Sequence, residues 1–319
     1  MLTVGVDVGG TSVRAGVVDA GGAVLDTTRS PTPEGGAPLE KAVVAAVTEL
    51  TARHPVAAVG LAVAGFVTEN RLGVRFAPHL AWRDTPVAEE MTGQLGLPVV
   101  LEHDTNAAAL AEYRFGAARG AKVAVLVALG TGIGGALLVD GQAFRGAYGV
   151  APELGHLRLV PGGRACPCGK RGCWERYCSG TALGATAVEL MATYPAMATV
   201  LDGASVTGRR VAAAAREGDP VARRAMAELA VWLGEGFALV ADVYDPEVIV
   251  VGGGVSESAP LFLDEARQHY AAVVTGAGHR PLARVRTAQL GADAGIVGAA
   301  TLARDLITDP GRPGIRRPR

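Results

Sequence analysis

Hydrophobic and polar positions along the chain follow two periods, and this pattern predicts an α/β protein. Short apolar runs bounded by turn residues indicate buried strands, whereas apolar residues that recur every three or four positions indicate amphipathic helices. The first part of the chain predicts three strands and a helix, and then a strand and a helix twice more. The expected strands cover residues 4–8, 13–19, 23–28, 57–63 and 99–102. The expected helices cover residues 37–53, 87–95 and 106–115.

The second part of the chain repeats the opening arrangement. A strand at residues 122–129, a glycine-rich turn and a returning strand at 136–140 match the opening when the sequence is shifted by 121 residues, which places Gly9 over Gly130. Further strands are expected at 248–251 and 284–287, and further helices at 259–274 and 294–304. The chain is therefore predicted to contain two related α/β halves with mixed sheets, and a small-molecule cleft between them.

This duplication sets the expected domains. An N-terminal α/β domain is expected at residues 1–117, and the C-terminal helix at about 294–307 is expected to pack back onto it. A second α/β domain is expected at residues 118–293, with a helical insertion at 181–244. Residues 309–319 carry three prolines and four arginines, which predicts a disordered basic tail.

Composition and charge exclude several classes of protein. The chain has 319 residues, of which 49% are hydrophobic and only 5% aromatic, so its cores are built from Ala, Val, Leu and Gly. A net charge of −1 argues against a nucleic-acid-binding protein. The apolar runs are too short to span a bilayer, so no membrane partner is expected. Free thiols without a targeting segment predict a cytoplasmic location.

Three of the four cysteines fall within eight residues, in the spacing C-x-C-x4-C. They are Cys166, Cys168 and Cys173, and His156 lies ten residues upstream of the first. Thiolates and imidazole are preferred zinc ligands, and four of them around one ion form a closed structural site. The residues alone leave His156 and Cys178 as alternative fourth ligands.

The chain around these cysteines is suited to a metal-bound loop. Gly169 and Gly172 allow the tight turns that bring three sulfurs to one ion. A disulfide is a weaker alternative, because C-x-C closes a strained ring. A zinc-ribbon interaction module would instead carry paired C-x2-C motifs. Glu153 and Glu175 flank the cluster, so a bound metal would fix two carboxylates in an arrangement suited to binding a polyol.

The two glycine-rich turns are candidate phosphate sites. Glycine lets backbone N–H groups approach and surround phosphate oxygens, and the neighbouring threonine hydroxyls add donors. The residues concerned are Asp7, Gly9, Gly10 and Thr11 in the first turn, and Gly130, Thr131 and Gly132 in the second. Asp7 ends a strand and is a candidate for holding Mg²⁺ through water molecules.

Residues 130–135 also fit the spacing G-x-G-x-x-G of dinucleotide-binding proteins, with Glu153 at a plausible distance for a ribose ligand. That fold requires a helix after the glycines, but residues 136–141 read as an apolar strand and a turn, so a dehydrogenase is rejected. The run Gly252-Gly253-Gly254 ends another strand. Because nucleotides often bind at strand ends, this run is assigned to the adenosine moiety.

Asp104 lies where a buried strand gives way to a helix. Asp and Asn are common helix N-caps, so capping is one interpretation of this residue. Thr105 or Asn106 can serve as the cap instead, which would leave the Asp104 carboxylate free to accept a proton from an attacking hydroxyl.

Together these motifs resemble the ROK family of sugar kinases, most closely its actinobacterial glucokinases. The resemblance covers residues 4–304, and the metal-binding motif preceded by Glu-x-Gly-His is its most specific part. The matching segments are 7–11, 64–65, 103–112, 129–135, 153–156, 166–175 and 252–254. The resemblance implies an actin-like, ribonuclease H-like ATPase fold, transfer of the ATP γ-phosphoryl group to the 6-hydroxyl of glucose, and a dimer or tetramer.

The resemblance also implies roles for individual residues. Asp104 would be the general base, and His156 would be the fourth zinc ligand while its other ring nitrogen reaches a sugar hydroxyl. Cys178 would then be a structural thiol. The other implied sugar-binding residues are Gly65, His103, Glu153 and Glu175.

Two positions depart from the family pattern. His103 stands where the family usually has Asn, which changes the hydrogen-bonding groups offered to the sugar. Ser12 stands where many relatives have Lys, with Arg14 two places on, which puts a cationic phosphate contact at position 12 in doubt.

Several alternatives stay open at this point. N-acetylglucosamine, N-acetylmannosamine, fructose or allose could replace glucose, and polyphosphate could replace ATP. A sugar-sensing repressor of the same family is disfavoured, because only six residues precede Asp7 and a helix-turn-helix does not fit there.

Overall fold

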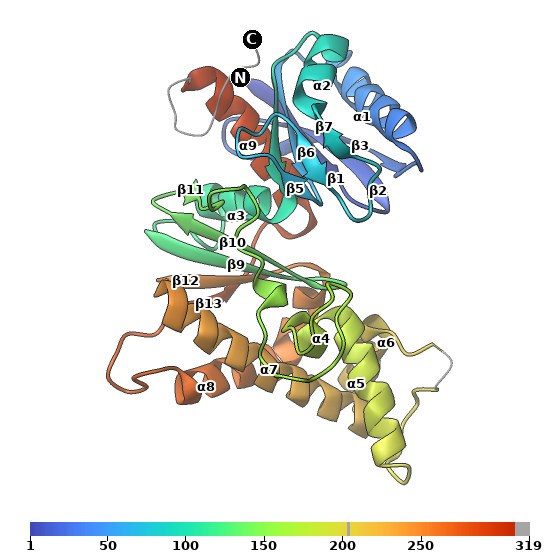
Figure 1. Cartoon of the computed structure of the whole chain (residues 1–319), viewed down its shortest axis with the longest axis vertical. Helices are drawn as coiled ribbons and strands as arrows, with labels where there is room; N and C mark the ends of the chain where they lie inside the picture. Colours follow the sequence, from blue (N-terminus) through green and yellow to red (C-terminus); the bar gives the residue numbers. More distant parts are fainter. Residues whose placement is uncertain (203–204, 310–319) are drawn as a thin grey trace. The chain divides into compact units, whose positions relative to one another are not determined.

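The computed structural model describes residues 1–202 and 205–309 (Figure 1). Within these residues the protein is a mixed α/β structure with two five-stranded sheets and one three-stranded sheet. The expected basic tail lies, from residue 310 onward, outside the described residues. In the described part of the chain, no helix is both long and apolar enough to span a membrane.

The first sheet has the strand order β3-β2-β1-β4-β8. Its strands are β1 (Leu2–Val8), β2 (Ser12–Val18), β3 (Val24–Pro31), β4 (Val56–Val63) and β8 (Val99–His103). The central strand β1 pairs antiparallel with β2 and parallel with β4, and β4 pairs parallel with β8. The parallel strands are apolar runs because helices cover both faces of this sheet.

The second sheet repeats this topology with the order β11-β10-β9-β12-β13. Its strands are β9 (Val123–Leu129), β10 (Ile133–Val139), β11 (Gln142–Ala143), β12 (Val248–Gly252) and β13 (Arg284–Thr287). Each sheet thus opens with an antiparallel hairpin beside parallel strands, which confirms the predicted duplication. The start of β10 was predicted wrongly, because the strand begins at Ile133 and includes two glycines that were expected to belong to the turn.

A third, three-stranded sheet was not anticipated. It consists of β5 (Phe66–Val67), β6 (Val74–Phe76) and β7 (Arg83–Thr85) in antiparallel order. Strands of two or three residues are too short to show an alternating pattern.

In the first sheet, α1 (Gly36–Thr51) and α2 (Val87–Leu95) pack on one face, and α3 (Asp104–Phe115) and α9 (Ala294–Thr308) on the other (Figure 1). Helix α9 lies close to the sheet because Gly5 and Gly60 are neighbours in β1 and β4. A Cβ at either position would lie 1.9 Å from a carbonyl oxygen of α9.

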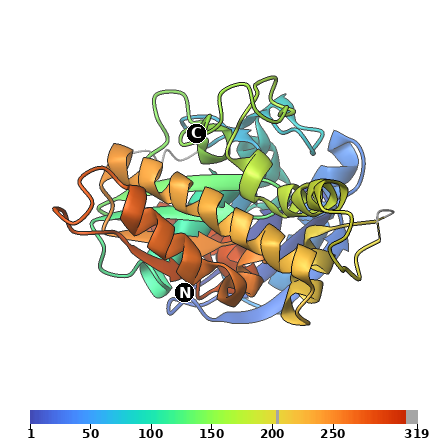
Figure 2. The same cartoon turned by 90° about the horizontal axis from the view of Figure 1, so that it is seen from below.

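The other helices are α4 (Glu175–Cys178), α5 (Gly180–Thr193), α6 (Gly208–Arg216), α7 (Pro220–Tyr244) and α8 (Leu263–Val273). Helices α7 and α8 lie side by side (Figure 2). The helix expected at 259–274 begins as a 3-10 segment, η2 (Gly254–Leu261), which contains Pro260. Trp174 is fully buried against α7, where a Cβ on Gly236 would lie 1.9 Å from its ring.

Internal contacts divide the chain into two compact units. The first contains residues 1–120, 136–152 and the chain from 289 onward, and the second contains 121–135 and 153–288. Helix α9 packs on β1 and β4 within the first unit. The domain limits expected from the sequence, 1–117 and 118–293, stay predictions.

Candidate functional site

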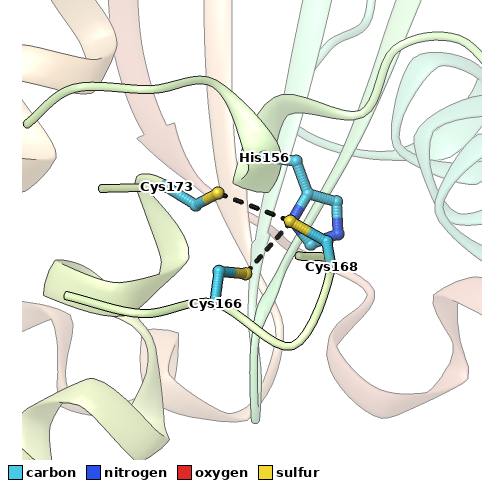
Figure 3. Close-up of side chains that lie close together, drawn as sticks. All are labelled: His156, Cys166, Cys168 and Cys173. Atoms are coloured by element: carbon cyan, nitrogen blue, oxygen red, sulfur yellow. Dashed lines mark hydrogen bonds between the residues drawn. The ribbon is translucent and has the colours of Figure 1, made fainter. Parts of the chain in front are cut away.

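Four potential metal ligands meet in the second unit: His156, Cys166, Cys168 and Cys173 (Figure 3). Their ligand atoms all lie within 4.8 Å of one another. The sulfurs of Cys168 and Cys173 are 3.6 Å apart, and the Cys166 sulfur is 3.7 Å from Nδ1 of His156. A tetrahedral zinc ion with Zn–S bonds of about 2.3 Å separates its ligands by about 3.8 Å. The cluster is therefore compatible with zinc.

Two glycines shape the loop that carries these cysteines. Gly169 and Gly172 both have positive φ, at 88° and 82°, a conformation that favours glycine. A Cβ at Gly172 would also lie 1.6 Å from the carbonyl oxygen of Val160. The Gly169 N–H donates to the carbonyl of Cys166, which closes the turn between the first two cysteines. These turns bring the three sulfurs together as the sequence predicted.

Cys178 lies apart from this cluster. It is fully buried in α4, and its thiol donates weakly to the carbonyl of Trp174, at 3.9 Å. Burial raises the pKa of the Cys178 thiol well above its ordinary value, so it stays protonated. Of the two candidates for the fourth ligand, the structure therefore places His156 with the three sulfurs.

The imidazole of His156 lies between the cluster and two carboxylates. Its Nδ1 faces the Cys166 sulfur and is 3.6 Å from Oε1 of Glu175, while its Nε2 is 3.9 Å from Oε2 of Glu153. The side chains of Glu153 and His156 are 40% and 30% exposed, so a solute can reach them. Two carboxylates and an imidazole nitrogen that lie this close can each bind a hydroxyl of one polyol.

The loop is seated directly on the hairpin between β9 and β10. A Cβ at Gly155 would lie 2.3 Å from the carbonyl oxygen of Ile133, and one at Gly135 would lie 2.4 Å from the side chain of Leu154. At the turn itself, a Cβ on Gly132 would lie 2.4 Å from Oε2 of Glu175. Because Gly132 has no side chain, the Glu175 carboxylate can lie against the glycine-rich turn.

The first hairpin, between β1 and β2, has its own close neighbour. A Cβ on Gly10 would lie 2.7 Å from Cβ of the exposed His79, which the sequence did not single out. Arg14 does not face the turn, because its guanidinium donates to the carbonyl of Ala292 and to Asp293 at 2.6 and 2.7 Å. Thr11 and Thr131 are both exposed at their turns.

Packing does not explain every glycine at these turns. Gly130 and Gly254 have no described atom within 4 Å of an added Cβ, and Gly9 has only an ordinary contact at 3.6 Å. None of the three has positive φ. Neither neighbouring atoms nor backbone conformation therefore requires glycine at these three positions, which leaves the backbone there open to the approach of a ligand.

Two other predicted glycines, Gly253 and Gly65, have structural reasons, and Gly252 does not. Gly253 has φ 79°, and its Cβ would lie 2.4 Å from the carbonyl oxygen of Leu129. A Cβ on Gly65 would lie 2.6 Å from the side chain of Ala77. Gly252 ends β12 with ordinary contacts at 3.4 Å.

Asp7 lies near the end of β1 with its carboxylate largely buried. Burial, and then the charge of Asp104, raise the pKa of Asp7 from 3.8 to about 6, while Arg14 opposes this rise. A buried carboxylate beside a second carboxylate is a good cation site, because the cation relieves both effects.

Asp104 is the first residue of α3, and its carboxylate is 37% exposed. His103 is the N-cap and makes no side-chain capping bond, so the expectation that Asp104, Thr105 or Asn106 caps this helix was wrong. Nε2 of His103 lies 3.4 Å from Oδ1 of Asp104, and Nδ1 bonds the hydroxyl of Thr105 at 2.7 Å. The imidazole and the carboxylate therefore sit side by side.

Glu102, which is 2% exposed, was not predicted from the sequence as a functional residue. Its carboxylate lies behind the Asp104 turn and is paired with Arg71 and Arg145. The available signal was an ionisable residue at the end of an otherwise apolar strand.

Comparison with known proteins agrees with this geometry. The profile of the ROK family matches residues 3–306. A glucokinase of Streptomyces coelicolor is 44% identical over 310 residues, which cover 95% of this chain and 98% of the relative.

Two solved structures are also similar. One is a ROK family glucokinase from Streptomyces griseus in complex with glucose and AMPPNP. It is 44% identical with a TM-score of 0.86, and the match covers 96% of this chain and 100% of that one. The other is a ROK hexokinase from Thermus thermophilus, with a TM-score of 0.80 and 34% identity, covering 97% of this chain and 100% of that one. This chain has the actin-like ATPase fold of ROK sugar kinases, as the sequence predicted.

Proposed function

This chain belongs to the ROK family, and we propose that it acts there as an ATP-dependent glucokinase. The observation that carries the proposal is the match at 44% identity to a glucokinase solved with glucose and AMPPNP, over 96% of this chain. The reaction transfers the γ-phosphoryl group of ATP to the 6-hydroxyl of glucose. The free cysteines of the described chain favour the reducing cytoplasm as its location, and the family resemblance favours a dimer or tetramer.

We assign sugar binding to the residues organised by the metal-ligand cluster. Glu153 and Glu175 accept hydrogen bonds from sugar hydroxyls, and Nε2 of His156 binds a third hydroxyl. His103 and a backbone group of Gly65 are assigned the remaining contacts. Specificity follows from donors and acceptors at fixed positions, because a sugar lacking one hydroxyl leaves a partner unsatisfied.

We propose zinc as the ion held by His156, Cys166, Cys168 and Cys173. Zinc supplies structural crosslinking here and no reactive ligand position, since all four positions are filled by the protein. With Nδ1 directed at the sulfurs, the opposite ring nitrogen keeps one orientation toward Glu153.

We assign nucleotide binding to the three glycine segments. Backbone N–H groups near Gly9 and Gly130 bind phosphate oxygens, as their unexplained glycines suggest. The segment Gly252-Gly253-Gly254 takes the adenosine moiety. Asp7 holds Mg²⁺, which neutralises phosphate charge when bound.

Asp104 is proposed as the general base. Its exposed carboxylate accepts the proton of the 6-hydroxyl as that oxygen attacks the γ-phosphorus. This assistance contributes about 10²–10⁴-fold to the rate. His103, 3.4 Å away, is proposed to contact the sugar next to this base.

A substrate panel tests the function. The purified protein is incubated with Mg-ATP and, separately, glucose, N-acetylglucosamine, N-acetylmannosamine, fructose or allose, and the ADP released is measured. We expect the highest kcat/KM with glucose. In parallel reactions with polyphosphate as the donor, we expect slower phosphoryl transfer than with ATP. A preparation that consumes ATP only with another hexose would refute glucose as the substrate.

A further inference from the structure

A buried ionic group lies behind the turn that carries Asp104. Glu102 and Arg71 are each 2% exposed, and the Arg145 side chain is 16% exposed. Arg145 donates to both oxygens of Glu102, with Nε 2.9 Å from Oε2, and Nε of Arg71 lies 3.5 Å from the same oxygen. All three residues belong to the first unit.

This group is a costly way to fill a core. Removing charges from water costs free energy that their attraction often fails to recover, and apolar replacements are frequently as stable. Arg71 also has φ 61°, an unfavourable backbone conformation for a bulky side chain. Strain and buried charge that persist next to a catalytic turn point to a role in positioning.

Glu102 grips the turn on both sides of Asp104. Its Oε1 accepts from the backbone N–H of His103 at 3.1 Å and from Nδ2 of Asn106 at 3.0 Å. The N-cap residue His103 makes no side-chain capping bond. Within the first turn, Oδ1 of Asp104 accepts from the backbone N–H of Thr105 at 2.7 Å, and Glu102 holds the same turn from the preceding strand. The two hydrogen bonds to Glu102 therefore tie the position of Asp104 to that of Glu102.

Arg145 in turn fixes Glu102. It follows β11, and its planar guanidinium forms a fork with the two carboxylate oxygens that an ammonium group cannot reproduce. A cavity of about 10 Å³ lies against Glu102, Asn106 and Arg145. Shortening Arg145 would enlarge this cavity. Because the Arg145 side chain is partly exposed, small solutes could then enter the enlarged cavity.

We propose that Glu102 and Arg145 are positioning residues for phosphoryl transfer, which hold the 103–106 turn so that the Asp104 carboxylate keeps its reactive orientation. This inference rests on the proposed function. Small displacements of a reacting group can cost up to about 100-fold in rate. Loss of the ion pair should therefore lower kcat and leave the KM for glucose nearly unchanged.

The test compares the kinetics of Arg145→Met, Arg145→Lys and Glu102→Gln with those of the wild type. Circular dichroism first establishes that each variant is folded. We expect kcat to fall about 10- to 100-fold in Arg145→Met and Glu102→Gln, with glucose KM within about threefold. Arg145→Lys, which keeps charge but not the fork, should fall between these variants and wild type. The matched control is Arg75→Met, which removes an exposed pair with Glu69 and should keep wild-type kinetics.

Chemical rescue separates positioning from structural support. Millimolar guanidinium chloride should restore much of the kcat of Arg145→Ala, while sodium chloride at the same ionic strength should not. If Arg145→Met does not fold, Glu102→Gln and Arg145→Lys carry the test. Wild-type kcat in the folded variants would overturn the inference. So would a fall in kcat that comes with an equally large rise in the KM for glucose and that guanidinium does not reverse. A wild-type protein that does not phosphorylate glucose would instead overturn the proposed function.

Discussion

Replacing Asp7 with Asn should make the protein more stable while removing the carboxylate that we propose holds Mg²⁺. Asp7 lies in the central strand β1, and burial is the main reason that its pKa rises from 3.8 to about 6. The charge of Asp104 adds to this rise, and Arg14, directly opposite in β2, reduces it. Asn keeps the shape of the side chain and removes the charge.

The expected gain follows from the pKa. The difference between 3.8 and about 6, at about 1.36 kcal/mol per pH unit, corresponds to at most about 3 kcal/mol. The folded chain holds this proton more tightly than the unfolded chain. The charge therefore weakens the fold fully above about pH 6, and its effect vanishes below the unfolded value of 3.8. Asp7→Asn should thus exceed wild type by about 2–3 kcal/mol at pH 8 and by little near pH 4.

Urea denaturation without divalent cations measures this difference. The free energy of unfolding is determined at pH 8, 6 and 4 for wild type, Asp7→Asn and the exposed control Asp264→Asn. The control should change by no more than about 0.5 kcal/mol at any pH. Added Mg-ATP should stabilise wild type but not Asp7→Asn. An Asp7→Asn protein less stable than wild type at pH 8, or equally shifted at all three pH values, would refute the reasoning.

Four further substitutions test other parts of the protein. Cys168→Ser should lose the metal and with it glucose binding; elemental analysis should find about one zinc per wild-type chain, and an active metal-free wild type would contradict this. Gly130→Ala should raise the KM for ATP at least about tenfold with unchanged stability, because a Cβ there meets only open space. Gly132→Ala would instead clash with Glu175 and should weaken glucose binding. Equal ATP kinetics in Gly130→Ala and wild type would be evidence against a phosphate site. Glu112→Ala removes the acceptor of three backbone N–H groups, one buried and two partly buried, and should cost at least about 2 kcal/mol in urea denaturation, so a loss below about 1 kcal/mol would count against that contribution.

Local patterns were sufficient for much of the fold. The helix expected at 87–95 and the strand expected at 284–287 match α2 and β13, because their limits are set by neighbouring residues. The duplication also followed from the sequence, since two hairpins with the same spacing of small and apolar residues produced the same strand order. The metal-ligand cluster was predictable because three of its members lie within eight residues.

Contacts between distant residues could not be predicted in this way. Arg145 and Glu102 are 43 positions apart, and Glu112 accepts N–H bonds from a segment 177 and 178 positions away. Neither pair leaves a periodic signal, because each depends on how separate elements pack. The start of α3 was also misjudged, since standard capping preferences favour Asp or Asn, whereas Glu102 holds this helix from the preceding strand.

The role of Asp104 is the most direct test of the account. Initial rates of glucose 6-phosphate formation from Mg-ATP and glucose should be measured for wild type and Asp104→Asn over a range of glucose concentrations. The account predicts product from wild type, and a kcat at least about 100-fold lower in Asp104→Asn with a similar KM for glucose. Near-normal turnover in Asp104→Asn would contradict it.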